Sequence, residues 1–187
     1  MTSQSSERPV LELPELRPPP AFAAVCPFIY RSGDPSGDPK SFDFLDTLHI
    51  KTMVLLSIEA PSKQLASYCS RSRVQMHHFG IERRWPSASK ACGGGGLSHN
   101  LFLSPHEINS FSVLESIVKD SMEILLDTRS YPALVLDTTG IFETGTLIGC
   151  LRKMQGWNFA SILVEYRSFA GARARSANER FIEVRLY

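Results

Sequence analysis

The architecture of this chain is indicated most directly by the stretch Leu134-Val135-Leu136-Asp137-Thr138-Thr139-Gly140-Ile141-Phe142-Glu143-Thr144-Gly145-Thr146. Its first residues form an apolar run typical of a buried strand, and a helical pattern follows over 145–155. A strand that enters a short loop and then a helix directs free backbone N–H groups and the helix N-terminus at one point. The stretch therefore predicts a loop of the kind that favours an anion.

The rest of the chain alternates between strand-like and helix-like patterns. We expect strands at 28–31, 51–58, 74–79 and 132–136, and helices that begin near 41, 61, 104, 145, 159 and 176. Ser41 is a candidate cap for the first of these helices. Strands that alternate with helices predict an α/β fold, with a mainly parallel sheet flanked by helices on both faces.

Length and composition indicate one domain with a tail. The 187 residues suffice for a single sizeable core. Residues 1–20 hold five prolines among polar residues and predict a disordered tail, which leaves 21–187 as the domain. The glycine run Gly93-Gly94-Gly95-Gly96 predicts a long flexible loop over 81–103.

The charge and hydropathy of the chain exclude several classes of protein. With 43% hydrophobic residues, 21% charged residues and a net charge of +1, it is neither wholly disordered nor a strongly basic nucleic-acid binder. No apolar run approaches the roughly 20 residues of a membrane span. The polar N-terminus has no apolar region of a secretory signal, so we expect a cytoplasmic location and no membrane partner.

Residue spacing predicts neither a metal site nor a cofactor. The four cysteines lie far apart, in none of the pairings that zinc or redox sites need: Cys26, Cys69, Cys92 and Cys150. His77 and His78 are adjacent in a predicted strand and so point to opposite faces of the sheet.

Two further stretches carry a family resemblance. Gly149-Cys150-Leu151-Arg152-Lys153-Met154-Gln155-Gly156-Trp157, followed by Glu165-Tyr166-Arg167-Ser168-Phe169-Ala170, resembles the plant and fungal atypical dual-specificity phosphatases. Their pattern there is approximately G-C-x-R-K-x-Q-x-W and then E-Y-R-x-F, and Ile29-Tyr30-Arg31-Ser32 matches upstream. Within that family the chain is most similar to the fungal tyrosine-phosphatase-like proteins of the oxidant-induced cell-cycle arrest group. The resemblance implies a dual-specificity phosphatase-like topology.

The active loop departs from the pattern of that family, which is H-C-x-x-G-x-x-R-T-G. Asp137 stands for the nucleophilic cysteine and Glu143 for the arginine that holds the phosphate. The variable positions are Thr138, Thr139, Ile141 and Phe142, and the loop-shaping positions that remain are Gly140, Thr144 and Gly145. The chain also has no aspartate that could match the general acid of the family, because no aspartate lies between Leu48 and Asp120. The nucleophile, the phosphate-binding arginine and the general acid of an intact cysteine-phosphatase site are therefore absent together.

The charges of the loop lead to a prediction of inactivity. A unit-charge pair at about 4 Å is worth roughly 4 kcal/mol at an effective dielectric constant near 20, so replacing arginine with glutamate changes the interaction with a phosphate by about twice that. We therefore expect Asp137 and Glu143 to satisfy the loop donors themselves. The protein is then a catalytically inactive scaffold or regulatory subunit, and the resemblance implies related phosphatase-family chains as its partners.

Two alternatives stay open. Seven basic residues against three glutamates after Gly149 could bind a polyanion. The resemblance implies inositol pyrophosphates or phosphoproteins as the ligands of such a binding module. The sequence Asp137-Thr138-Thr139-Gly140 is similar to the strand-D-x-T-G opening of haloacid-dehalogenase-like phosphatases, where the aspartate is the nucleophile. That chemistry uses Mg²⁺ and a second acidic cluster, and the acids after Gly145 include no paired aspartates.

Overall fold

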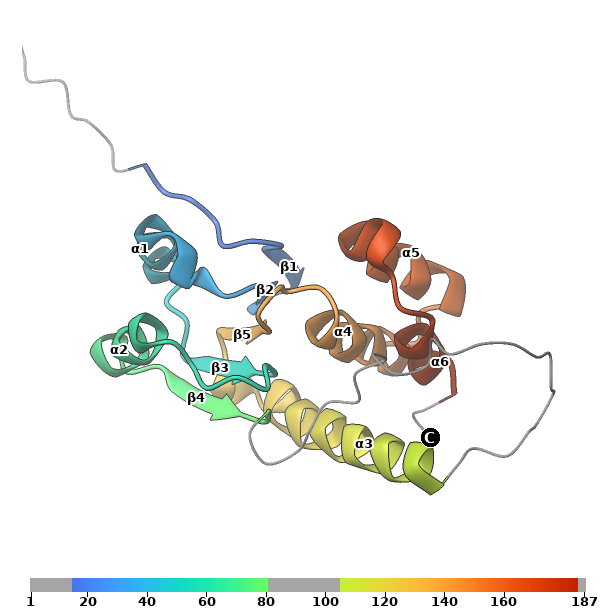
Figure 1. Ribbon diagram of the computed structural model, residues 1–187. Coiled ribbons are helices and arrows are strands. Elements are labelled where there is room, and N and C mark those ends of the chain that lie inside the picture. The colour runs from blue at the N-terminus through green and yellow to red at the C-terminus, as the bar shows by residue number, and fades with distance from the viewer. Residues whose placement is uncertain (1–14, 81–104, 185–187) are drawn as a thin grey trace, which may run out of the picture.

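The computed structural model describes residues 15–80 and 105–184, with the side chains described from 114 onward in the second range. A five-stranded sheet forms its centre, in the order β1-β2-β5-β3-β4 (Figure 1). The strands are β1 (Ala23–Cys26), β2 (Ile29–Ser32), β3 (Thr52–Leu55), β4 (Gln75–His78) and β5 (Ala133–Leu136). All neighbouring strands are parallel except β1 and β2. The predicted mainly parallel α/β sheet is confirmed, and the antiparallel edge strand β1 was not predicted.

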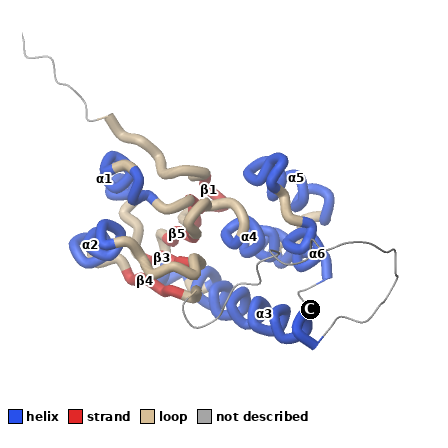
Figure 2. The backbone as a smooth tube through the Cα atoms, in the orientation of Figure 1, coloured by secondary structure: helices blue, strands red, loops and turns tan. Residues whose placement is uncertain are grey.

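Helices cover both faces of this sheet, as Figure 2 shows. They are α1 (Pro39–Thr47), α2 (Lys63–Ser72), α3 (Pro105–Leu126), α4 (Glu143–Met154), α5 (Phe159–Ala170) and α6 (Ser176–Val184). One core joins the sheet to α1 and α2, and the other joins it to α3, α4, α5 and α6. Side chains of β3 contribute to both cores because they alternate between the two faces of the sheet. Met53 and Leu55 lie in the first core, and Val54 lies in the second.

Short polar side chains begin these helices. Asp38 accepts a hydrogen bond from the Lys40 N–H at 3.0 Å and caps α1, whereas Ser41, the predicted cap, is buried inside that helix. Pro39 explains the difference, because a proline at the first helical position moves the start of the helix two residues upstream of the predicted one. Ser62 caps α2 in the same way, with its Oγ 3.1 Å from the Leu65 N–H.

The predicted tail and loop fall largely outside the described residues. Residues 81–103, the predicted flexible loop, lie wholly outside them, as do residues 1–14 of the predicted tail. Residues 15–20 run along the domain, where Arg17 forms an ion pair with Asp38 at 3.1 Å. The domain boundary at residue 21 stays a prediction. No helix in the described part of the chain is both long enough and apolar enough to cross a membrane.

Candidate functional site

The candidate site lies at the carboxyl end of β5, the central strand of the sheet. Because β2 and β3 flank β5 in parallel, the loops that follow all three strands meet at this edge. The Asp34 N–H, after β2, donates to the Thr138 carbonyl at 3.4 Å. Ser57, after β3, lies with its Oγ 3.2 Å from the Thr138 hydroxyl. The loop 137–142 is therefore held on both sides before it enters α4.

Asp137 occupies the centre of the loop. Its side chain is buried, and its Oδ1 accepts the N–H groups of Thr139 and Gly140, each at 2.6 Å. Its Oδ2 accepts the Thr144 N–H at 2.9 Å, in the first turn of α4. Phe142, at the N-cap position of α4, makes no side-chain capping bond, so Asp137 caps this helix from five residues farther upstream. Asp137 alone accepts these three backbone N–H groups, whereas we expected from the sequence that Asp137 and Glu143 would share them.

Glu143 differs from Asp137 in its protonation. It is the first residue of α4, and its side chain is 19% exposed. Burial and the neighbouring Asp137 carboxylate raise the pKa of Glu143 to about 7, although Arg175, with its Nη1 3.7 Å from Oε1, opposes the shift. Glu143 is therefore easier to protonate near neutral pH than an ordinary glutamate.

This raised pKa predicts how stability depends on pH. A carboxyl whose pKa rises from 4.5 to about 7 on folding contributes its full stability below pH 4.5, and the contribution is lost as the pH rises through 7. Glu143→Gln removes that titration and should raise the free energy of unfolding at pH 8 by up to about 3 kcal/mol. Urea unfolding of Glu143→Gln and of the wild type at pH 5 and pH 8 measures this change in the free energy of unfolding. A difference between variant and wild type that is equal at both pH values would contradict the assignment.

Two arginines bring positive charge to the loop, and the sequence did not point to either as a site residue. Arg31, in β2, is fully buried, and its Nη2 donates to the Gly140 carbonyl at 2.7 Å. The guanidinium carbon of Arg175 lies 3.6 Å from the centre of the Phe142 ring and beside Glu143. Arg31 belongs to the family-like stretch 29–32 and Arg175 to the basic C-terminal segment. Only the fold brings both to the loop.

The remaining loop residues divide between the rim and the interior. Thr138 lies at the rim, where its Oγ1 is 3.2 Å from Oε2 of Glu59, an acid that the sequence interpretation overlooked. Ile141 and Phe142 pack in an apolar cluster with Tyr166. Thr144 is buried in α4, and so is Gly145, where an added Cβ would lie 2.9 Å from the Tyr166 ring. Within the described residues, no group of three or more His, Cys, Asp or Glu side chains could hold a metal ion.

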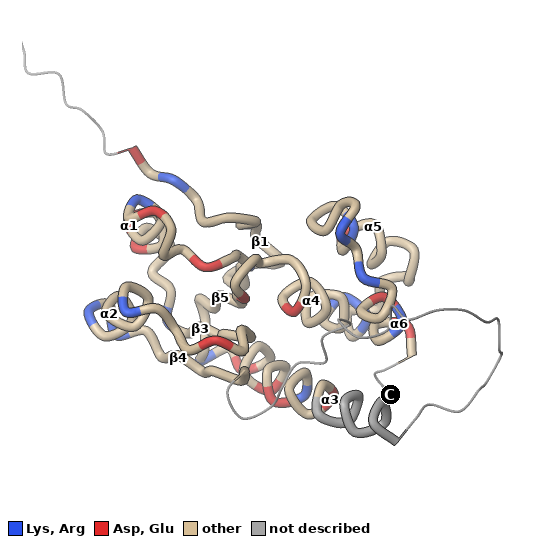
Figure 3. The backbone as a smooth tube through the Cα atoms, in the orientation of Figure 1, with Lys and Arg blue, Asp and Glu red and all other residues tan. Residues whose placement is uncertain are grey.

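Arg152, Arg167 and Arg175 of the basic segment after Gly149 form ion pairs with glutamates. Arg152 forms a bidentate pair with Glu165, at 2.7 and 2.8 Å, and Arg167 binds Glu179 at 2.6 Å. Charges of both signs are mixed over the helices (Figure 3). The charges of Arg152 and Arg167 are therefore balanced by glutamates and are not available to a bound polyanion.

Comparison with known proteins shows the family. A model described as "Tyrosine phosphatase family" matches residues 16–185. The chain belongs to the tyrosine phosphatase family. OCA1 of Meyerozyma guilliermondii, which carries a provisional tyrosine-protein phosphatase name, is 37% identical over 169 residues, 89% of this chain and 81% of that protein. Inositol diphosphatase DSP4 of Arabidopsis thaliana is 33% identical over 167 residues, 89% of this chain and 72% of that protein.

A solved structure extends this likeness to three dimensions. The core catalytic domain of the PP-IP phosphatase SIW14 from S. cerevisiae, in complex with citrate, superposes with a TM-score of 0.70 at 27% identity. The match covers 91% of this chain and 88% of that one. The dual-specificity phosphatase-like topology implied by the sequence is thereby confirmed for this tyrosine phosphatase family member.

The prediction that this family member is catalytically inactive, and with it the scaffold role, is wrong. Relatives that match about nine-tenths of the chain are named as phosphatases, and the structural likeness is to a catalytic core. The charge argument failed for two physical reasons. It treated Glu143 as fully charged, whereas burial raises its pKa to about 7. It also left out Arg31 and Arg175, which offset the carboxylates.

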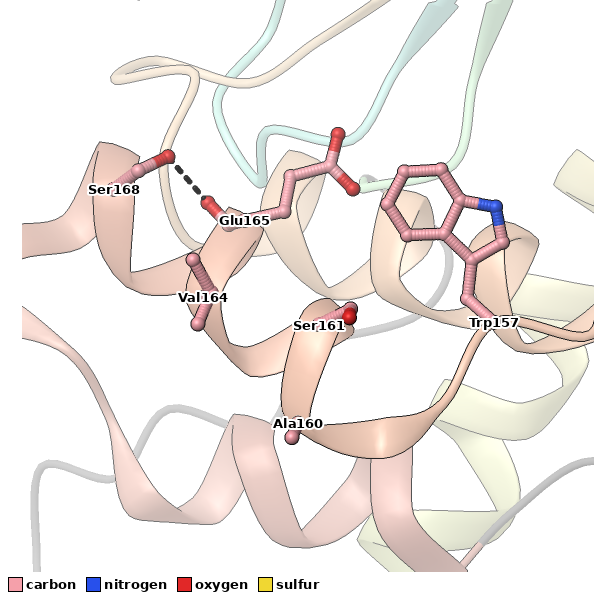
Figure 4. A pocket seen from close by; sticks show the side chains of 6 residues that line it. All are labelled: Trp157, Ala160, Ser161, Val164, Glu165 and Ser168. Carbon is pink, nitrogen blue, oxygen red and sulfur yellow. Dashed lines mark hydrogen bonds between the residues drawn. The ribbon is translucent and has the colours of Figure 1, made fainter.

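An open hollow of this phosphatase-family fold lies on α5 and the turn before it. Figure 4 shows its wall, which is lined by Trp157, Ala160, Ser161, Val164, Glu165 and Ser168 and encloses about 470 Å³. None of these residues belongs to the loop 137–145. The predicted association with related family members, and the cytoplasmic location, stay predictions.

Proposed function

We propose that this protein is a phosphatase that cleaves phosphate esters or diphosphates at the loop 137–145, with Asp137 and Glu143 as its reacting carboxyl groups. The observation that carries this proposal is the pairing of a buried Asp137 carboxylate with a Glu143 carboxyl whose pKa is raised to about 7. Neighbouring carboxyl groups in different protonation states are the usual basis for assigning a base or nucleophile and an acid. The names of the relatives support phosphotyrosine and inositol diphosphates as the substrate classes to test.

The chemistry assigns one role to each carboxyl group. The Asp137 carboxylate attacks phosphorus and forms an acyl phosphate, while protonated Glu143 donates its proton to the departing oxygen. Water then attacks the acyl phosphate, and the Glu143 carboxylate accepts a proton from that water. Inorganic phosphate leaves, and both carboxyl groups return to their starting states. Over the two steps, the substrate and one water molecule give the free alcohol or phosphate leaving group and inorganic phosphate.

The charges around the loop allow a phosphate to approach when Glu143 is protonated. The N-terminus of α4 and the Arg175 guanidinium both favour an anion at this end of the helix. Buried Arg31 offsets the Asp137 charge from within the domain. Above pH 7 the charged Glu143 opposes the anion, so we expect activity to fall as the pH rises through 7.

Phosphate release from three substrates tests the proposal. We expect the protein to release phosphate from p-nitrophenyl phosphate, a phosphotyrosine peptide or an inositol diphosphate. Asp137→Asn should lower the rate by at least about 100-fold, because it removes the nucleophile. Glu123→Gln is the matched control, since it neutralises an exposed carboxylate on α3 and should leave the rate unchanged. No release from any of the three, or a rate that Asp137→Asn leaves intact, would overturn the proposal.

A further inference from the structure

Arg31 is a buried cation without a salt bridge in the described structure. Its side chain is 1% exposed, and burial lowers its pKa to about 10. Nε and Nη1 have no hydrogen-bond partner among the described residues, whereas Nη2 donates to the Gly140 carbonyl at 2.7 Å. The guanidinium carbon lies 3.7 Å from the centre of the Phe169 ring. Buried charges are usually paired, and this arrangement therefore needs an explanation.

The residue that Arg31 binds is the most constrained in the loop. Gly140 has a φ of +73°, and an added Cβ would lie 2.4 Å from the Gly33 N atom. Its N–H points to Asp137, at 2.6 Å, while its carbonyl points to Arg31. The N–H and the carbonyl of Gly140 are thus held by opposite charges: Asp137, directly after β5, and Arg31 in β2.

We propose that Arg31 is a positioning residue, whose guanidinium holds the Gly140–Ile141 peptide so that the N–H groups of the loop stay directed at the Asp137 carboxylate. The other end of this peptide is held by the Ile141 N–H, which donates to the Thr139 hydroxyl at 3.2 Å. Without a donor at the Gly140 carbonyl that bond alone holds the peptide, and the glycine before it permits rotation. If this peptide rotates, the Gly140 carbonyl turns away from the Arg31 guanidinium and toward the Asp137 and Glu143 side chains. This role accounts for a buried guanidinium that forms no ion pair within the described residues, although the Glu165 and Asp137 carboxylates act on it from a distance.

Amide hydrogen exchange of the unliganded protein tests this role. In Arg31→Met, the amides of Thr139, Gly140 and Thr144 should exchange at least about 10-fold faster than in wild type, because their hydrogen bonds to Asp137 open more often. Arg31→Lys keeps the charge and a donor, and it should restore exchange to within about threefold of wild type. A residue that only fills space would not distinguish lysine from methionine in this way.

Arg152→Met is the matched control for the loss of a buried guanidinium. Arg152 is 7% exposed, stacks on Trp157 and donates to the Val25 carbonyl at 2.8 Å, away from the loop. It should accelerate exchange in α4 and α5 and leave Thr139 and Gly140 unchanged relative to the global opening rate. If Arg31→Met is too unstable to measure, Arg31→Gln replaces it, because its shorter side chain also leaves the Gly140 carbonyl without its donor.

The proposal is overturned if exchange in the loop is equal in Arg31→Met and Arg152→Met. It is also overturned if Arg31→Lys accelerates the loop as much as the neutral variants do. The role rests on the loop as the site of the proposed function, but exchange is measured without substrate. An inactive wild type would therefore refute the phosphatase proposal while leaving the exchange result to decide the role of Arg31.

Discussion

Gly140→Ala should lower the free energy of unfolding by about 2–5 kcal/mol. The φ of +73° costs an alanine about 1–2 kcal/mol. The added Cβ would also lie 2.4 Å from the Gly33 N atom and 2.5 Å from the Ser32 carbonyl carbon, which are backbone atoms that cannot rotate away. Relieving such contacts costs about 1–3 kcal/mol more, because the loop must move off β2. Urea unfolding, monitored by circular dichroism, measures the loss.

Gly156→Ala separates the two causes. Gly156 has a similar φ, +79°, but an added Cβ there meets nothing within 4 Å. Its substitution should therefore cost only the conformational part, about 1–2 kcal/mol. If both variants lose the same stability, the close approach of Gly140 to the Ser32–Gly33 backbone does not contribute, and the loop is less tightly held than the structure indicates.

Glu165→Ala should destabilise the protein by about 3 kcal/mol. Glu165 accepts two hydrogen bonds from Arg152, whose side chain is 8% exposed, and so joins α5 to α4. Removing one partner of a buried ion pair leaves the other charge without compensation, at a cost of about 3–5 kcal/mol. The lower end applies here, because Arg152 keeps the Val25 carbonyl and the Gln155 side chain as acceptors.

Glu179→Ala is the control for this second effect. Glu179 also accepts two hydrogen bonds from an arginine, Arg167, but that guanidinium is 56% exposed. An ion pair of this kind contributes at most about 1 kcal/mol, since water replaces the lost partner. Thermal and urea unfolding of both variants distinguish the pairs. Equal losses would mean that burial of Arg152 is not what makes its pair important.

Local sequence pattern predicted the larger elements well. The apolar run before Asp137 forms β5, and the predicted helices at 159–169 and 176–184 correspond to α5 and α6 almost to the residue. These segments were predictable because period and capping are properties of neighbours in the chain. The strand β1 was missed because its four residues, AAVC, carry no alternation of their own and depend on pairing with β2.

The candidate site was only partly predictable. Asp137 and Gly140 were identified as loop residues, and Asp137 does bind the loop donors. The protonation of Glu143 was not predictable, because its pKa depends on burial and on the distance to Asp137. This omission turned a group that can donate a proton into an apparent obstacle to phosphate. Together with the omission of Arg31 and Arg175, it led to the mistaken prediction of inactivity.

The amino-acid sequence alone was sufficient to predict the α/β class, the strand–loop–helix unit around Asp137 and the family. These features depend on residues within about one or two turns of each other. Packing was needed to bring Arg31, more than 100 positions away, to the Gly140 carbonyl, and to place Arg175 beside Glu143. Electrostatic energy depends on distance and burial in space rather than on separation along the chain. The charge balance of this site is therefore a property of the folded domain.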